Sequence, residues 1–338
     1  MTLRQFLLRR VLLVIPILFG ITFITFMLVR VGDRDPVAML AGPLADRQTL
    51  ATLRTEMGLD RSFWEQFAIY VGKLIQLDFG KSWESNNPVI VDIANRLPAS
   101  LELLLIAMLI GAAVGIPVGL RSAQRPNGAF DQAARFVSLL GFSVPTYWFA
   151  LMGIFIFFFK LGWAPPPMGR IGLDAIPPPD VTGSYFIDSL LVADWSALHS
   201  SGTRLVLPVL IFSVIVAAPI IKHTRAIALE VLSSDYIRYA RASGLSPFTV
   251  RRIALRNAFT PVLTFVASEL TGLLAAVSLL EFIFAWGGMG QWGLNAILNS
   301  DFAAVQGYVL TLALFSAVIY VMVDIAVLML EPRSALKA

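Results

Sequence analysis

Six long apolar runs, almost free of charged side chains, dominate this sequence. Glu269 is the single charged residue inside them, and the runs span residues 11–29, 103–120, 136–159, 205–221, 258–280 and 302–323. Each run is long enough, or nearly so, to cross a hydrocarbon core about 30 Å thick. A backbone in lipid must satisfy its own hydrogen bonds, so these runs are expected to be helices. The sequence therefore predicts an all-α, polytopic membrane protein with six transmembrane helices.

The composition agrees with a lipid environment. Hydrophobic residues make up 57% of the 338 residues and charged residues only 14%, whereas soluble domains carry about 25% charged residues. The first run follows Arg9 and Arg10. It is longer than the core of a typical signal peptide, and no small-residue cleavage site follows it. We expect it to be retained as the first transmembrane helix.

Loop charges predict that both termini lie in the cytoplasm. With that orientation the cytoplasmic segments hold fifteen Lys and Arg against four acids, and the outer segments hold eleven against fifteen. Short cytoplasmic loops of membrane proteins carry an excess of Lys and Arg, which sets their topology.

Two outer connections differ in their patterns. Apolar residues at helical spacing within 49–57 and 63–77 predict a small helical cap outside the membrane after the first span. The later connection, 162–203, contains six prolines and shows no clear period, which favours irregular structure.

Motifs for catalysis are absent. Residues 80–82 read G-K-S like the end of a phosphate-binding loop, but Ile75 stands where that loop needs its first glycine. The chain has no cysteine and no G-x-S-x-G nucleophile motif. His199 and His223 are predicted on opposite sides of the membrane, so they cannot form a paired-histidine metal site. We expect no catalytic residue, metal or cofactor, and no ATP hydrolysis by this chain.

The segment between the fourth and fifth runs carries clear helix punctuation. Ser234 or Asp235 is suited to cap a short helix, and Gly244 is suited to end it in the left-handed conformation. Ser246 can then cap a second helix that has Pro247 at its first position. The segment is predicted to form a helix–turn–helix projecting into the cytoplasm.

The faces of this helix pair allow two interpretations. Ile237, Ala240 and Ala242 are small or apolar, and they could enter a groove on a soluble partner whose acidic rim meets the arginines. Alternatively, the pair could rest on anionic lipid headgroups. The pattern by itself favours neither. The basic residues are Arg238, Arg241, Arg251, Arg252 and Arg256.

This segment, about 233–258, resembles the E-A-A-x-x-x-G coupling loop of ATP-binding-cassette importer permeases. It is most similar to the dipeptide and oligopeptide permease branch. The matching positions, which the resemblance implies are the ATPase-coupling residues, are Asp235, Tyr236, Arg238, Ala240, Arg241, Ala242, Gly244, Arg256 and Asn257. The chain departs from that branch at Tyr239, Ser243 and Ile253.

Further strings are similar to the same branch and occur in the same order along nearly the whole chain. They include Asp35-Pro36, Gly58-Leu59-Asp60, Asp78-Phe79-Gly80, Phe142-Ser143-Val144-Pro145 and Glu331-Pro332-Arg333. The resemblance implies the fold of a type I importer permease. Residues 1–98 would hold the first helix and the external cap, 99–331 a five-helix transmembrane domain, and 332–338 a cytoplasmic tail.

The resemblance also implies a function and partners. The chain would be a bacterial inner-membrane permease that forms half of a translocation pathway beside a sister permease, most simply as a heterodimer. Two ATPase subunits and a periplasmic solute-binding protein would complete the importer, with di- or oligopeptides as cargo and no nucleic acid involved. The same machinery could instead carry nickel chelates, glutathione, opines or sugars.

Glu269 bears on a different class of function. A stand-alone secondary transporter usually has several charges near the membrane midplane or repeated broken helices, and Glu269 is the only charge that fits. Within an importer, Glu269 could line the pathway. Alternatively, it could be a structural carboxyl bonded to Ser268, Thr271 or a neighbouring helix.

Overall fold

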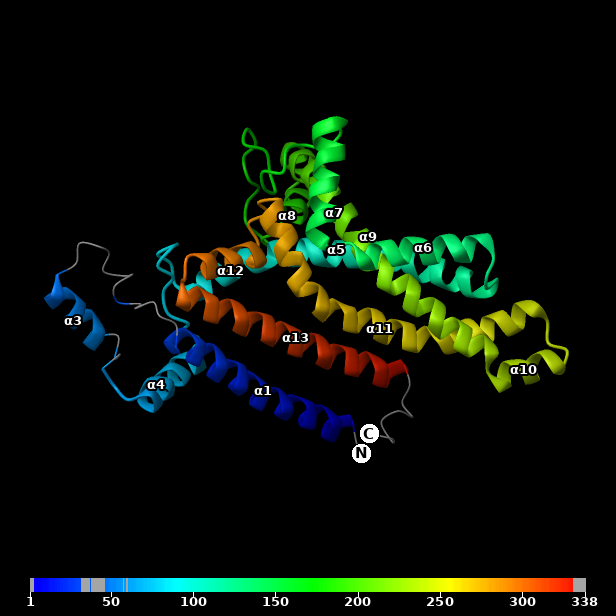
Figure 1. The fold of residues 1–338 in the computed structure, drawn as a ribbon, viewed down its shortest axis with the longest axis horizontal. Coiled ribbons are helices and arrows are strands. Elements are labelled where there is room, and N and C mark those ends of the chain that lie inside the picture. Colours follow the sequence, from blue (N-terminus) through cyan, green and yellow to red (C-terminus); the bar gives the residue numbers. More distant parts are fainter. Residues whose placement is uncertain (1–2, 32–36, 38–45, 57, 59, 331–338) are drawn as a thin grey trace. The chain divides into compact units, whose positions relative to one another are not determined.

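A computed structural model describes residues 3–31, 37, 46–56, 58 and 60–330 (Figure 1). Within these ranges the chain is helical apart from turns and loops, with one isolated antiparallel bridge between Lys81 and Pro88. The strings at 35–36 and 331–333, Leu59 and the tail 332–338 lie outside the described residues. In chain order the helices are α1 (Leu3–Val31), α3 (Arg47–Glu56), α4 (Phe63–Ile75), α5 (Val89–Gln124), α6 (Ala129–Ser143), α7 (Thr146–Gly153), the π-helix η1 (Ile154–Lys160), α8 (Tyr185–Leu191), α9 (Trp195–Ser233), α10 (Asp235–Ala242), α11 (Pro247–Ile283), α12 (Met289–Leu298) and α13 (Phe302–Leu330).

Five of the six predicted spans each fall on a single helix. The helices α5, α9, α11 and the part of α13 up to Ala326 are each long and apolar enough to cross a membrane. A shorter apolar stretch of α1, Leu12–Leu28, occupies the place of the predicted first span. The helices α6 and α7–η1 are long and apolar enough for one more span only when taken together, and they are bent by 101° at the break between them. The all-α, polytopic membrane fold predicted from the sequence is confirmed.

The third span differs from the single helix predicted for residues 136–159. α6 ends at Ser143 and α7 begins at Thr146. Pro145 has no N–H to donate and disfavours a helical conformation in the residue before it. Val144 is accordingly extended, with φ −90° and ψ 129°. The proline therefore breaks the run into two helices instead of bending one helix gently.

The chain forms two compact units. The larger comprises Met1–Phe6, Pro98–Gln291 and Val318–Ala338, and the smaller comprises Leu7–Leu97 and Trp292–Ala317. In the smaller unit α4 packs on α1 through aromatic rings, and the ring centroids of Phe23 and Phe67 are 5.3 Å apart.

The two helices predicted after the first span are present as α3 and α4. α4 begins at a capping box, in which the Ser62 hydroxyl accepts from the Glu65 amide and the Glu65 carboxylate accepts from the Ser62 amide. This reciprocal arrangement satisfies two backbone donors that a helix start leaves without partners.

In the larger unit α5 approaches α9 closely along a line of glycines. Cβ atoms added at Gly111 and Gly115 would lie 2.6 Å from Val216 and 2.8 Å from Ile220. At Gly119 an added Cβ would lie 2.7 Å from Thr224 and 2.8 Å from the backbone carbonyl of Ile221. Glycines four residues apart allow two membrane helices to pack backbone to backbone. This line therefore sets the separation between α5 and α9.

The connection 162–203 is more ordered than its composition predicts. Its two proline runs are non-helical, as expected, but α8 lies within it and α9 begins at Trp195. Asp188 of α8 accepts hydrogen bonds from the Thr182 hydroxyl at 2.7 Å and from the backbone amides of Val181, Thr182 and Gly183. Burial raises the pKa of Asp188, but these bonds outweigh it and hold the pKa below its ordinary value. The Asp188 carboxylate therefore holds residues 181–183 in place against α8.

Candidate functional site

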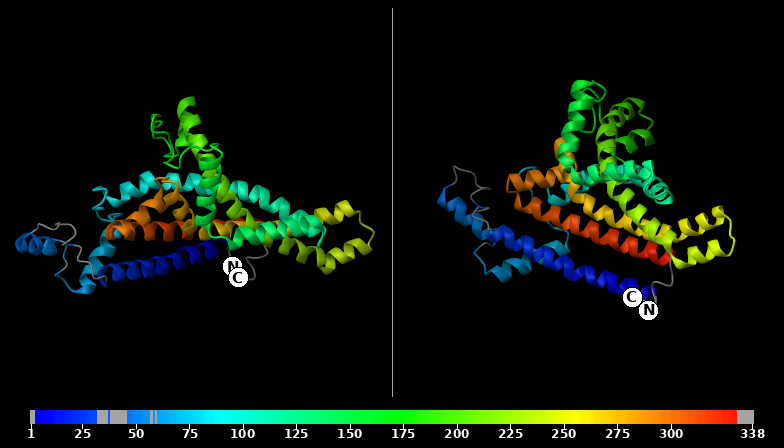
Figure 2. Two further views of the ribbon diagram at one scale, coloured as in Figure 1. Left: turned by 45° about the horizontal axis from the view of Figure 1, so that its top comes forward. Right: turned by 45° about the vertical axis from the view of Figure 1, so that its right-hand side comes forward.

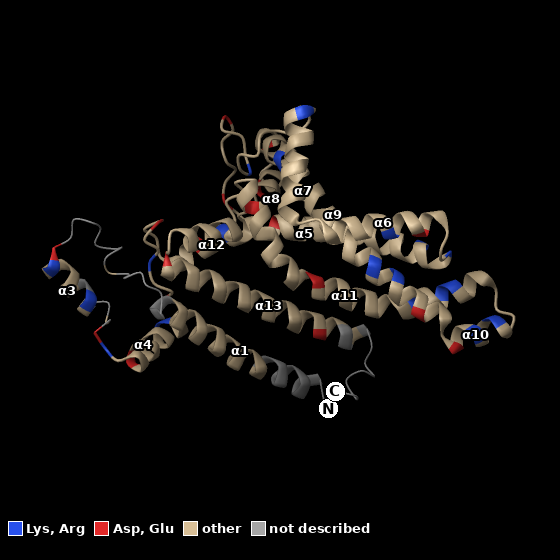
Figure 3. Ribbon diagram, viewed as in Figure 1, with Lys and Arg blue, Asp and Glu red and all other residues tan. Residues whose placement is uncertain are grey.

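The most prominent feature of the larger unit is a helical hairpin at one end of its long helices. α9 leads into α10, and α10 turns back into α11, so the hairpin forms the tip of two long membrane helices (Figure 2). We call residues 234–257 the α10 hairpin and this end of the unit the α10 end. Lys and Arg recur along the hairpin and along the neighbouring helix ends (Figure 3).

The start of α10 lies where the sequence predicts it, but the cap differs in detail. Ser234 is the residue before the helix, with φ −67° and ψ 153°, yet its hydroxyl makes no capping bond. Instead it donates to the carbonyl of Val231 at 2.6 Å, the final turn of α9. Asp235 provides an acid in the first turn of α10, where the positive end of the helix dipole favours it. The hydroxyl is thus used to end α9 and not to begin α10.

The turn of the hairpin matches its prediction closely. Gly244 has φ +76°, a conformation that a residue with a Cβ adopts only under strain. The amide of Leu245 donates to the carbonyl of Ala240 at 3.2 Å, closing the helix. The Ser246 hydroxyl accepts from the Thr249 amide at 3.3 Å, and Pro247 occupies the first position of α11.

The interior of the hairpin is a small hydrophobic core. Ile237 is fully buried and Ala240 is 7% exposed, and they pack against Val250 and Ala254 of α11. The idea that Ile237 and Ala240 enter a partner groove is therefore wrong for this structure, because their side chains are used inside the hairpin. Both residues therefore stabilise the packing of α10 on α11.

The outward surface of the hairpin is aromatic and basic. Among the residues matched to the coupling loop, Tyr236, Arg238, Arg241, Ala242 and Gly244 are exposed. Two further rings of the hairpin are exposed: Tyr239, which departs from the family pattern, is 75% exposed, and Phe248, for which the sequence predicts no role, is 76% exposed. Phe248 directly follows the Ser246-Pro247 cap, and an aromatic residue at the second position of a capped helix is the signal that could have identified it.

The remaining matched residues have modest local contacts. Arg238 lies 3.6 Å from Asp235 with both side chains largely in solvent, so this ion pair adds little stability. Arg256 and Asn257 are exposed on α11, and the Asn257 amide donates to the carbonyl of Ile253 at 2.8 Å. Arg256 therefore has its charge available to a partner.

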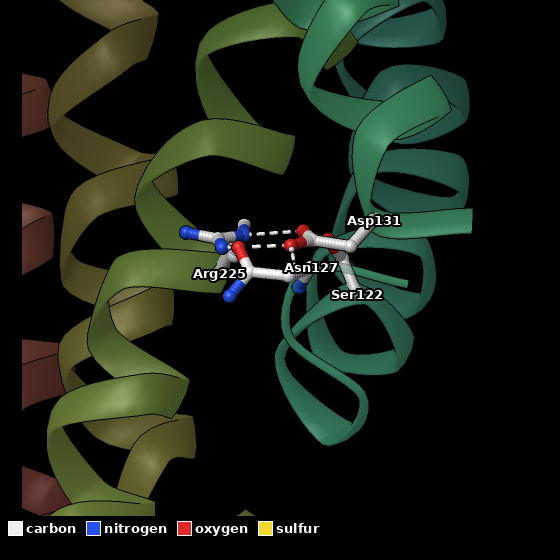
Figure 4. Close-up of polar contacts among 4 residues, drawn as sticks. All are labelled: Ser122, Asn127, Asp131 and Arg225. Carbon is white, nitrogen blue, oxygen red and sulfur yellow. Dashed lines mark hydrogen bonds and ion pairs between the residues drawn. The ribbon is translucent and has the colours of Figure 1, made fainter. Parts of the chain in front are cut away.

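A buried ion pair fixes the helices that carry the hairpin. The Arg225 guanidinium of α9 donates from Nε to Oδ1 of Asp131 at 2.5 Å and from Nη2 to Oδ2 at 2.8 Å (Figure 4). The Ser122 hydroxyl and the Asn127 amide donate to the same carboxylate. Asp131 lies in the first turn of α6, so the pair joins the start of α6 to α9.

The Asp131 side chain is fully buried and that of Arg225 is 19% exposed. A two-pronged arginine–carboxylate contact is strong and geometrically specific. The pair holds α9 in place 9 residues before the hairpin begins, as the numbering of Arg225 and Ser234 shows.

Glu269 lies half-buried in the middle of α11. The Ser268 hydroxyl donates to the carbonyl of Phe265, and that of Thr271 donates to the carbonyl of Ser268, so neither bonds to Glu269. His223 of α9 stacks on Phe265, which lies one helical turn before Glu269 in α11, with 4.0 Å between ring centroids. The structure places Glu269 on a different part of α11 from the hairpin.

Comparison with known proteins identifies the chain. Residues 115–335 match the family model of the binding-protein-dependent transport system inner membrane component, and residues 3–104 match the model of the N-terminal part of such components. The chain belongs to this family. The permease is 38% identical to the di/tripeptide transport system permease protein DppB of Pseudomonas aeruginosa (strain UCBPP-PA14), over 97% of this chain and 98% of that protein.

Other relatives agree. The dipeptide transport system permease protein DppB of Escherichia coli (strain K12) is 37% identical over 97% of this chain and 98% of its own length. The protein of the same name from Alkalihalophilus pseudofirmus is 34% identical over 96% and 97%. These relatives are transport permease subunits and not enzymes. The permease is accordingly a multi-pass inner-membrane component of an ATP-driven, binding-protein-dependent importer, and membership implies ATPase subunits and a solute-binding protein as its partners.

Proposed function

We propose that this permease carries di- or oligopeptides and that the α10 hairpin is the element through which ATPase subunits drive it. The peptide cargo is supported by the printed names of its relatives, which transport dipeptides or di- and tripeptides. The role of the hairpin is supported by its exposed aromatic and basic surface, held rigid by its own core and by the Asp131–Arg225 pair.

The arrangement suggests how force is transmitted. Ile237 packs α10 onto α11, and Arg225 fixes α9 to α6, so the hairpin moves with its long helices and not independently of them. When ATP binding closes the ATPase pair, a docked hairpin would move α9 and α11 together. A ligand can shift such an equilibrium only by its differential affinity for the two states, and a rigid hairpin carries that difference into the membrane.

The proposal includes a topology and an assembly. Both termini would lie in the cytoplasm, which puts the α10 hairpin on the side where ATP is available. A sister permease would pack beside this chain with the pathway between them, and Glu269 would face that pathway. Residues 1–98 and 99–331 would act as an N-terminal extension and the transmembrane domain, respectively.

The docking role can be tested on the exposed arginines. Replacing Arg241 with Glu should reduce co-purification of the ATPase subunits and transport, because it reverses a charge on the docking surface without touching the hairpin core. Arg135→Glu is the matched control, since Arg135 is an exposed arginine that belongs to α6 and not to the α10 hairpin. Equal ATPase recovery in the two variants, both normally inserted, would argue against docking.

The cargo can be tested on the binding protein that co-purifies with the importer. Titration calorimetry with di- to pentapeptides should show binding, and nickel chelates, glutathione, opines and sugars should not bind. A binding protein that takes only the non-peptide solutes would reject the peptide cargo while leaving the docking role intact.

A further inference from the structure

A second feature at the α10 end is a pocket with a basic wall. Its volume is about 810 Å³, and it lies between the α5–α6 turn and the first turns of α11. Arg121 lines it from the last turn of α5, Arg125 from the turn that follows α5, and Arg251 from α11. All three belong to the larger unit, so the pocket is formed within one compact body.

The three arginines have no acidic partner among the described residues. The nearby carboxylate, Asp131, has both oxygens engaged by Arg225 and is turned toward α9. The Arg121 guanidinium instead lies over the ring of Phe130, 5.1 Å from its centroid. Three like charges around one pocket repel one another, so an anion bound between them would relieve that repulsion.

The rest of the lining is apolar. Pro117, Leu120, Phe130 and Leu255 complete the walls of the pocket. Leu120 is the final residue of the second apolar run and Arg121 is the first charged residue after it. The pocket therefore lies where the apolar run of α5 ends and charged residues begin.

We propose that this pocket binds the phosphate headgroup of an anionic membrane phospholipid. Guanidinium groups match a phosphate because their N–H donors form a planar fork. The apolar wall would take the first carbons of the lipid chains, which free phosphate does not have. Basic pockets between membrane helices on the cytoplasmic side are suited to anionic headgroups.

A bound headgroup would affect the movement of the α10 hairpin. Arg251 lies on α11 just after the turn of the α10 hairpin. Arg121 lies in the last turn of α5 and Arg125 in the α5–α6 turn, and the first turn of α6 is connected to α9 through Asp131. One phosphate held between them would restrain the base of α11 relative to α5 and α6. The lipid would thus bias the movement of the hairpin without touching its outward docking surface.

The test uses the full chain purified in detergent, depleted of lipid and titrated with phosphatidylglycerol, with bound lipid counted by native mass spectrometry. Replacing Arg251 with Gln should weaken binding about fivefold, since one arginine near an anionic surface contributes about that factor. The triple variant R121Q/R125Q/R251Q should weaken it about a hundredfold. Arg251→Lys keeps the charge and should retain most of the affinity.

Arg252→Gln is the matched control, because Arg252 is also exposed and adjacent to Arg251 but does not line the pocket. Its affinity for phosphatidylglycerol should equal that of the wild type. Equal binding by the triple variant and the wild type would overturn the proposal.

Two further measurements distinguish the lipid from other possible ligands of the pocket. Inorganic phosphate should displace phosphatidylglycerol only weakly, because it lacks the chains that contact the apolar wall. Displacement at equal concentrations would overturn the lipid assignment in favour of free phosphate. If the triple variant kept its lipid but lost the ATPase subunits, the pocket would belong to the ATPase interface, and the proposal would fall.

Discussion

Arg225 of α9 donates hydrogen bonds to both carboxylate oxygens of Asp131 of α6, although the two residues are 94 positions apart in the sequence. The carboxylate is fully buried and also accepts from Ser122 and Asn127. This contact decides how the base of the α10 hairpin is held.

Replacing Asp131 with Asn should destabilise the permease by about 3 kcal/mol, because it leaves the partly buried Arg225 charge without its partner. Arg225→Lys should have a smaller effect, since it keeps the charge but loses the fork. The midpoint of thermal unfolding in detergent measures both. An Asp131→Asn midpoint equal to that of Arg135→Gln, a control at an exposed arginine, would contradict the structural role of the pair.

The glycine line between α5 and α9 yields a second prediction. Gly119→Ala should destabilise the chain by about 1–3 kcal/mol through overpacking, because the new Cβ would lie 2.8 Å from the carbonyl oxygen of Ile221 and 3.1 Å from the amide nitrogen of Arg225. Gly272→Ala in α11 is the control, since an added Cβ there meets nothing within 4 Å. Its stability should stay within about 1 kcal/mol of the wild type. Equal melting of the two variants would show that α5 and α9 do not approach this closely.

Asp188 should make the connection 162–203 sensitive to acid. Its pKa is held below the ordinary value, so its stabilising effect is present above the unfolded pKa of about 3.9 and is lost as pH falls through the folded pKa. We expect wild type to melt at a higher temperature than Asp188→Asn at pH 7. The difference should shrink as pH falls below about 4. A difference that did not change with pH would exclude the ionised carboxylate as its cause.

Glu269 should matter for transport and not for folding. Ser268 and Thr271 direct their hydroxyls to backbone carbonyls, so Glu269→Gln removes no bond to either. We expect the variant to melt like the wild type and to retain its ATPase subunits, while peptide uptake by reconstituted importers falls. A lowered melting temperature with normal uptake would instead assign Glu269 a structural role.

Much of the hairpin could be predicted from the sequence, because its signals are local. Gly244 takes its left-handed conformation, and Ser246 and Pro247 start α11 as expected, since these preferences depend on neighbours within one helical turn. Ser234 shows the limit of this reasoning. Ser234 precedes α10 as the sequence predicts, but its hydroxyl donates to the carbonyl of Val231 in the last turn of α9. The residue pattern alone does not show whether this hydroxyl bonds to the end of α9 or to the start of α10.

The faces of the hairpin were harder to assign. Ile237 and Ala240 are apolar, and the pattern could not say whether they meet a partner or α11; the structure buries them against Val250 and Ala254. Tyr239 was treated as a departure from the family pattern, yet it is among the most exposed residues of the hairpin. Which face of α10 is buried depends on how α10 folds back onto α11. The residue pattern within α10 alone does not contain that information.

The sequence by itself determined that the chain is helical, that it lies in a membrane and that Gly244 takes the left-handed conformation after α10. Hydropathy, charge and capping act over short stretches of chain, so each of these features has a local signal. Only the tertiary structure decided that Arg225 meets Asp131, that Gly119 touches α9, and that Arg121 and Arg251 line one pocket. Those relationships arise when helices distant in sequence pack together. Side-chain packing and hydrogen bonding act over a few ångströms, so they depend on tertiary position and not on spacing along the chain.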